Sequence, residues 1–254
     1  MKNEILRHIE HTLGRDPQTP DQYACFMGLA YSIRDRLVER WIKTQRSLHD
    51  AMAKRVYFLS LEFLPGRFLM SYLLSLNMAD EARIALQELG FDLDELEEVE
   101  WDAGLGNGGL GRLASCFMDS IACLKLPGYG YGIRYDYGIF HQVLEDGYQK
   151  EECDNWGRSA NAWEIRRRER LMPVRFYGRT ESFPDPDGRL RFRWVEGEIV
   201  LALACDILIP GLGAEYVTNM RLWTALSSRG FSLQEFTQGD YVGAVQAKVL
   251  SENI

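Results

Sequence analysis

The stretch DAGLGNGGLGR, residues 102–112, holds five glycines in eleven positions. Consecutive glycines let a backbone turn through conformations closed to other residues, and their N–H groups can approach an anion with no Cβ in the way. A helical pattern follows from Leu110 to Leu124, and the amino-terminal end of such a helix carries partial positive charge. The residues alone therefore leave two hypotheses open: a binding loop for a phosphate or sugar oxygen, or a tight turn that only packs against a neighbour.

A dinucleotide site is a further alternative, because the stretch satisfies G-x-G-x-x-G twice. That fingerprint requires a strand directly before it and an acidic residue about 20 positions later. Asp94–Trp101 is mostly acidic with helical spacing, and Lys125–Gly128 stands where the acidic residue would be. A nucleotide-binding oxidoreductase domain is therefore the weaker hypothesis.

Helical patterns dominate the chain before the glycine stretch. Thr19-Pro20-Asp21 is typical of a helix start, and the apolar spacing predicts a helix over 21–46. Val56–Leu64 is rich in β-formers and ends at Pro65-Gly66, which predicts a buried strand. Three further helices are expected at Phe68–Leu76, Asp80–Leu89 and Asp92–Glu100.

Strand-like patterns dominate after the glycine-rich helix, on which Leu113, Cys116, Phe117, Ser120 and Leu124 share one face. Strands are expected at Gly128–Tyr135 and Gly138–Val143 around a turn, and at Arg175–Arg179, Arg189–Val195 and Ile199–Leu208. Helices are expected at Thr218–Leu226 and from Asp240 to Ile254, where the chain would stop inside a helix. This alternation predicts an α/β fold with a mostly parallel sheet and an inserted antiparallel portion.

The composition excludes several classes of protein. A net charge of −8 disfavours a nucleic-acid partner, and the basic cluster Arg166–Arg170 is interpreted as a solvated helix face. No apolar run approaches the roughly 20 residues of a membrane span, and the amino terminus lacks a signal sequence, so we expect a cytoplasmic protein. Five cysteines without a C-x-x-C pair predict neither a disulfide framework nor a metal site.

Many short motifs, spread over nearly the whole chain, resemble those of the glycogen, starch and maltodextrin phosphorylases. The matching segments are His11–Asp16, Arg34–Leu37, Arg40-Trp41, Leu59–Leu64, Gly66-Arg67, Asp102–Arg112, Tyr129–Tyr135, Tyr137–Phe140, Arg221–Trp223 and Gln238–Tyr241. The resemblance implies that residues 51–254 form the Rossmann-like amino-terminal domain of a two-domain GT-B type glycosyltransferase. Residues 1–50 would form a helical segment before it.

The resemblance also implies an activity. These enzymes transfer the terminal glucose of an α-1,4-glucan to inorganic phosphate and release glucose 1-phosphate, with pyridoxal phosphate held on a lysine. That lysine belongs to the carboxyl-terminal half of these enzymes. The resemblance implies two partners for this chain: that carboxyl-terminal half and a second subunit of a homodimer. None of this chain's lysines stands in its motif: Lys2, Lys43, Lys54, Lys125, Lys150 and Lys248. We therefore expect no catalytic residue in this chain and no activity from it alone.

By the same resemblance, the glycine stretch supplies a phosphate- and sugar-binding loop. Its residues are Gly106, Asn107, Gly108, Gly109 and Leu110, of which the last three would offer backbone N–H groups. Glu62, Leu64 and Arg67 are candidate cleft residues, and Glu62 is either a site carboxylate or the ion-pair partner of Arg67. A non-catalytic carbohydrate-binding or subunit-contact module remains the alternative function.

Overall fold

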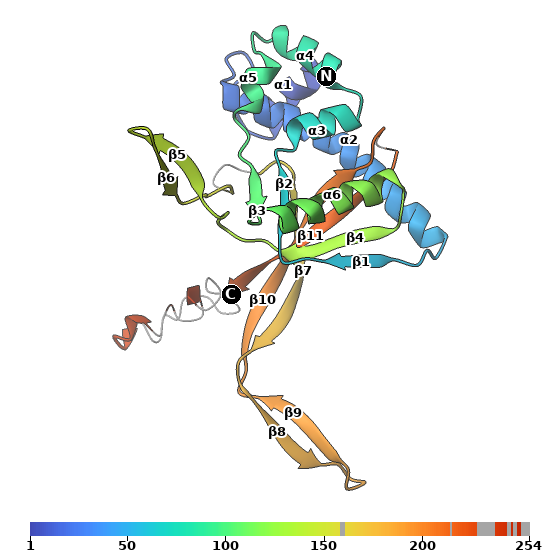
Figure 1. The fold of residues 1–254 in the computed structure, drawn as a ribbon, viewed down its shortest axis with the longest axis vertical. Helices are drawn as coiled ribbons and strands as arrows, with labels where there is room; N and C mark the ends of the chain where they lie inside the picture. Colours follow the sequence, from blue (N-terminus) through green and yellow to red (C-terminus); the bar gives the residue numbers. More distant parts are fainter. Residues whose placement is uncertain (158–160, 214, 228–236, 243–244, 246–247, 250–254) are drawn as a thin grey trace. The chain divides into compact units, whose positions relative to one another are not determined.

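The structure is a computed structural model, and it describes residues 1–157, 161–213, 215–227, 237–242, 245 and 248–249. The helices are α1 (Lys2–His11), α2 (Gln22–Asp50), α3 (Leu69–Ser75), α4 (Ala79–Gln87), α5 (Leu93–Glu97) and α6 (Gly109–Cys123). The strands are β1 (Val56–Leu59), β2 (Phe63–Gly66), β3 (Ala103–Leu105), β4 (Gly128–Ile133), β5 (His141–Glu145), β6 (Tyr148–Glu152), β7 (Glu164–Phe176), β8 (Arg179–Pro184), β9 (Leu190–Val195), β10 (Glu198–Pro210) and β11 (Val217–Ser227). The chain is a mixed α/β protein, as predicted (Figure 1).

Five of the described strands form one sheet, in the order β1-β4-β11-β10-β7. β1 and β4 are parallel, with Val56 opposite Gly128, whereas the pairs β2-β3, β5-β6 and β8-β9 are antiparallel. The chain divides into two compact units. The first comprises Met1–Ile165 and Asp206–Leu222, and the second comprises Arg166–Cys205 and Trp223–Ile254.

The amino-terminal helices α1 and α2 pack closely within the first unit (Figure 1). Asp21 caps α2, because its side chain accepts a hydrogen bond of 2.7 Å from the N–H of Ala24. At Gly28 a Cβ would lie 2.9 Å from the carbonyl oxygen of Ile5 and 3.1 Å from a side-chain carbon of Ile9. Glycine is therefore needed at this position for the two helices to approach.

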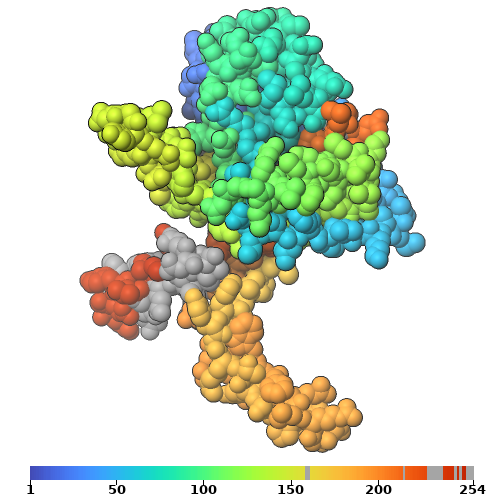
Figure 2. Space-filling model, in the orientation of Figure 1, coloured from blue at the N-terminus to red at the C-terminus, as the bar shows by residue number. Residues whose placement is uncertain are grey.

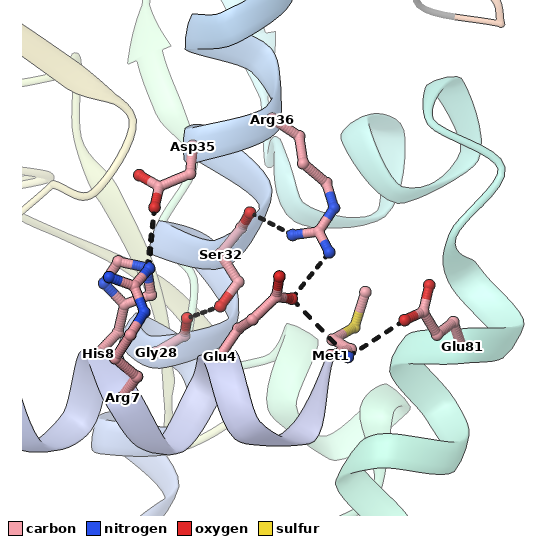
Figure 3. Close-up of polar contacts among 9 residues, drawn as sticks. All are labelled: Met1, Glu4, Arg7, His8, Gly28, Ser32, Asp35, Arg36 and Glu81. Atoms are coloured by element: carbon pink, nitrogen blue, oxygen red, sulfur yellow. Dashed lines mark hydrogen bonds and ion pairs between the residues drawn. The ribbon is translucent and has the colours of Figure 1, made fainter.

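His8 lies buried between these helices (Figure 3). Its Nδ1 is 2.9 Å from Thr12 Oγ1, and its Nε2 is 3.0 Å from the guanidinium of Arg7 and 3.2 Å from Asp35 Oδ2. Burial lowers the pKa of His8, against an opposing effect of the Asp35 carboxylate. A neutral ring that donates from Nδ1 and accepts from Arg7 at Nε2 satisfies both of its nitrogen atoms.

Glu4 carries a second polar contact between these helices (Figure 3). Its carboxylate accepts a 2.7 Å hydrogen bond from Arg36, which also donates to the carbonyl oxygen of Ser32 at 2.9 Å. The amino group of Met1 lies 3.7 Å from Glu4 and 3.2 Å from Glu81 of α4. These ion pairs connect α1 with both α2 and α4.

The β8-β9 hairpin of the second unit has all of its charged strand residues on one face. Paired residues point to the same side of an antiparallel ribbon, and the pairs Thr180–Trp194, Ser182–Phe192 and Pro184–Leu190 make one face uncharged. The ion pairs of the hairpin are formed among its own residues: Arg179 with Glu181 and Glu196, Arg191 with Asp185, and Arg193 with Glu181.

Two strand predictions need correction. Val56–Leu64 was expected to be one buried strand, but it forms β1, which is largely exposed, followed by β2. β1 ends the sheet order, so only one of its edges is paired among the described strands. The turn expected between Gly128–Tyr135 and Gly138–Val143 does not join paired strands, because β4 pairs with β1 and β5 pairs with β6.

The helix expected at Thr218–Leu226 is wrong, because this segment lies in strand β11. β11 is an inner strand between β4 and β10, so both of its edges are paired. Its first four residues, Val217–Met220, are all buried, so the alternation typical of a half-exposed strand is absent. The Thr218 hydroxyl donates to the carbonyl of Gly128 in β4, and Asn219 donates to Asp206 in β10 at 3.1 Å. The partners in these hydrogen bonds lie 90 and 13 positions away in the sequence, so a local pattern does not indicate them.

The basic cluster Arg166–Arg170 lies on strand β7 and not on a helix. Of the helix expected from Asp240 to Ile254, positions 241–242, 245 and 248–249 are helical, whereas Asp240 is not. The other positions lie outside the described residues. Among the helices that are described, none has the length and apolar character needed to cross a bilayer.

Candidate functional site

The glycine stretch connects strand β3 to helix α6. β3 pairs antiparallel with β2, with Phe63 opposite Leu105, and the chain then turns through Gly106, Asn107 and Gly108. A short strand therefore does precede the loop, which the acidic helical pattern before it did not predict. This strand belongs to a two-stranded antiparallel pair, whereas a dinucleotide fingerprint requires a parallel β-α-β unit.

Glu62 holds the loop through its carboxylate. The backbone N–H of Asn107 donates to Glu62 Oε2 at 3.2 Å, and the Asn107 side-chain amide lies 3.4 Å from Oε1. A Cβ on either Gly106 or Gly111 would lie 3.3 Å from the Cβ of Glu62 and 3.3 Å from the Cα of the other glycine. A Cβ at either position would therefore fit only if its neighbours moved by a few tenths of an ångström, because the start of α6 packs directly on the loop and on Glu62.

Arg67 does not pair with Glu62, contrary to one of the two expectations for that carboxylate. Its guanidinium makes two hydrogen bonds to Glu98, of 2.9 and 3.0 Å, and lies 3.8 Å from Asp102. Arg67 therefore connects the end of β2 to the acidic segment that enters the glycine stretch.

Leu64 contributes its backbone to the same support. Its carbonyl oxygen lies 3.4 Å from Arg112 Nη1, which also donates to the carbonyl of Pro65 at 3.0 Å. Arg112 thereby fastens the first turn of α6 to β2. The structure thus brings Glu62 and Leu64 to the loop, and places Arg67 on its flank.

Gly108, Gly109 and Leu110 form an open set of backbone donors. Arg112 is the first residue of α6 to donate its N–H within the helix, to the carbonyl of Gly108 at 2.9 Å. No side chain of the described residues caps this helix. A Cβ at Gly108 or Gly109 would meet no atom within 4 Å, so a ligand oxygen can approach these N–H groups. Their directed donors and the helix dipole favour a negatively charged oxygen.

Three residues near the loop were missed by sequence reasoning. The rings of Trp101 and His141 stack with centroids 4.8 Å apart. Burial raises the pKa of Asp154, against an opposing effect of His141, and a Cβ on Gly104 would lie 3.5 Å from its carboxylate. No spacing in the sequence connects His141 to Trp101 or Asp154.

The side-chain amines of most lysines are engaged by carboxylates. Four lysines make surface ion pairs: Lys2 with Glu88, Lys43 with Glu39, Lys125 with Glu215, and Lys150 with Glu145. Within the described part of the chain, no group of three His, Cys, Asp or Glu side chains could hold a metal ion. The open N–H groups at the start of α6 make the binding and charge stabilisation of an anion the candidate chemistry of this site.

Comparison with known proteins gives consistent matches. The profile of the carbohydrate phosphorylase family matches residues 86–254. The chain is 48% identical to the brain form of human glycogen phosphorylase, 46% identical to the human liver form, and 47% identical to the liver form of Bos taurus. Each alignment covers 100% of this chain but only 29–30% of the relative.

Proposed function

This chain belongs to the carbohydrate phosphorylase family, and from that premise we propose that it forms the amino-terminal, Rossmann-like part of a GT-B type α-glucan phosphorylase. Such an enzyme would transfer the terminal glucose of an α-1,4-glucan to inorganic phosphate. In this proposal residues 1–50 are the helical segment, and residues 51–254 are the α/β domain that contributes one wall of the active site.

One observation carries the proposal: the N–H groups of Gly108, Gly109 and Leu110 lie at the uncapped start of α6 with open space before the two glycines. Phosphorolysis moves negative charge among phosphate oxygens and generates positive charge on the sugar ring. Fixed neutral donors stabilise phosphate oxygens without a proton transfer and without reorganising during the reaction. Glu62 keeps these donors in place through Asn107.

The chain spans about 30% of the length of the curated relatives that it matches. We therefore propose that pyridoxal phosphate and its lysine come from the remaining part of a phosphorylase, and that this cofactor supplies a phosphate group for proton transfer. The residues of this chain would bind and orient the substrate phosphate and the transferred sugar. Alone, the chain should release no glucose 1-phosphate from maltodextrin and phosphate.

The test uses a chimera that joins this chain to the part of human brain glycogen phosphorylase beyond the aligned region. Gly109 is the first residue of α6, a position that tolerates proline, so Gly109→Pro removes one N–H and retains the helix. We expect kcat to fall by about 10²-fold or more, as for removal of one oxyanion donor. Gly109→Ala keeps the N–H and is the matched control. Equal rates for the two variants would show that this N–H takes no part.

A further inference from the structure

The β8-β9 hairpin has an exposed face that carries no charge. Trp194, Phe192 and Leu190 of β9 lie on this face and are 50%, 65% and 63% exposed. Apolar side chains that gather on one exposed face mark an interaction site, whereas single ones scattered over a surface do not. We call the neutral face the six exposed residues that share this side: Thr180, Ser182, Pro184, Leu190, Phe192 and Trp194.

The opposite side of the hairpin and its turn hold the neutral face in a fixed register. Arg193 makes hydrogen bonds of 3.0 and 3.1 Å to Glu181, the residue directly across from it on the other strand. In the turn, the Asp185 carboxylate accepts hydrogen bonds from the backbone N–H groups of Asp187 and Arg189, at 3.0 and 2.8 Å. A backbone that is already ordered loses less entropy when a ligand binds. The neutral face is therefore a preorganised surface.

The neutral face places a row of aromatic rings beside a row of hydroxyl groups. Phe192 and Trp194 are two residues apart on β9, so their rings follow each other at about 7 Å along the strand. Across the ladder, Ser182 lies opposite Phe192 and Thr180 lies opposite Trp194. The indole N–H of Trp194 donates to the carbonyl of Tyr177, which fixes this ring. A pyranose sugar has an apolar C–H face and a rim of hydroxyl groups, so it matches both rows at once.

The size and charge of the neutral face decide between classes of ligand. β8 and β9 are six residues long and form a two-stranded sheet, drawn in light orange in Figure 2. From strand spacing and rise, one side of this ribbon covers roughly 200 Å². A stable protein interface takes about 800 Å² from each partner, so this face is too small for one. It also has no cation for the phosphates of a nucleic acid, because the arginines of both strands lie on the opposite side.

We propose that the neutral face binds an uncharged oligosaccharide, an α-1,4-glucan chain, as a site separate from the donor loop. Sugar rings stack on Trp194 and Phe192, and sugar hydroxyls form hydrogen bonds with Thr180 and Ser182. The choice of an α-1,4-glucan among uncharged oligosaccharides rests on the proposed function. The neutral face belongs to the second compact unit and the donor loop to the first, so each contacts glucan through its own residues.

The experiment titrates the 254-residue chain with maltoheptaose. The nuclear magnetic resonance signal of the Trp194 indole N–H, assigned by its loss in Trp194→Phe, should shift as the glucan binds. In calorimetry the double variant Phe192→Thr, Trp194→Thr should bind about tenfold more weakly, because two stacking contacts are lost. Threonine is chosen because it favours strands. Phe183→Thr is the matched control: it removes a ring of the same hairpin from the opposite face and should leave binding unchanged.

Three results would overturn the inference. The Trp194 signal could stay unshifted at saturating maltoheptaose, the double variant could bind as tightly as Phe183→Thr, or the face could instead join two copies of the chain, seen as a dimer that only the double variant dissociates. The signal of the unsubstituted chain decides the matter even if the double variant does not fold. No readout needs turnover: an inactive chimera whose hairpin binds maltoheptaose contradicts only the proposed function, and an active chimera whose Trp194 signal ignores the glucan contradicts only this inference.

Discussion

Gly111→Ala tests whether the donor loop and the start of α6 are held by close packing on Glu62. The added Cβ would lie 3.3 Å from three atoms: the Cβ and Oε2 of Glu62 and the Cα of Gly106. Ordinary carbon contacts lie at about 3.5–4.0 Å. Two of these three atoms belong to the backbone or adjoin it, so a side-chain rotation cannot remove the overlap.

The expected magnitude is the difference of two opposing effects. Overpacking a tight contact costs about 1–3 kcal/mol. Replacing glycine by alanine inside a helix raises the stability of the helix by about 1 kcal/mol. We therefore expect a net loss of about 1 kcal/mol in the free energy of unfolding, or about 2–4 °C in Tm for a domain of this size.

Gly109→Ala is the matched comparison, because a Cβ there would meet no atom within 4 Å. This variant should be as stable as the unsubstituted chain or slightly more stable. Urea unfolding followed by tryptophan fluorescence and circular dichroism measures both. If Gly111→Ala proved at least as stable as Gly109→Ala, the packing of the loop on Glu62 would not constrain this position.

Further predictions concern residues outside the loop. Burial holds the pKa of His8 below its ordinary 6.5, so the unfolded chain binds more protons between the two pKa values and stability rises with pH across that window. His8→Gln should flatten this rise, whereas His11→Gln, on an exposed residue, should leave it unchanged in unfolding titrations from pH 4.5 to 7.5. Asp206→Ala leaves Arg221 without its paired hydrogen bonds of 2.8 Å and should lower the free energy of unfolding by about 3 kcal/mol in urea. Arg112→Met removes the bonds to Leu64 and Pro65 and should cost about 1 kcal/mol by the same measurement; no loss would show that α6 is held by packing alone.

Local patterns predicted several helices well, because helix starts and apolar spacing are encoded within a few residues. They did not predict α1 or the last four residues of α2. The Asp21 cap and the boundaries of α3, α4 and α6 fall within one or two residues of those expected. The helix prediction for Thr218–Leu226 was wrong because an inner strand is stabilised by hydrogen bonds to the strands on either side of it, which a local pattern does not reveal. Its partners Gly128 and Asp206 lie 90 and 13 positions away from the residues they bond.

The candidate site was predicted in part for the same reason. The glycine stretch indicated an anion-binding loop, and the resemblance assigned Gly108, Gly109 and Leu110 as its donors, which stays a prediction. The structure places these residues at the uncapped start of α6. The partner of Glu62 could not be chosen from sequence: Arg67 is five residues away, but the bond is to Asn107, 45 residues away. The stacking of Trp101 on His141 is equally non-local.

The β8-β9 hairpin offers a place to attach a reporter. Arg179, Arg191 and Arg193 pair with acidic residues in or next to the same hairpin, and its turn from Asp185 to Gly188 is largely exposed. Exposed loop tips are the sites at which proteins best accept inserted sequences. A short peptide tag placed in this turn would leave the cross-strand ion pairs of Arg179 and Arg193 in place. A dye bound to this tag would let the chain be followed by fluorescence in binding experiments while the donor loop stays unlabelled.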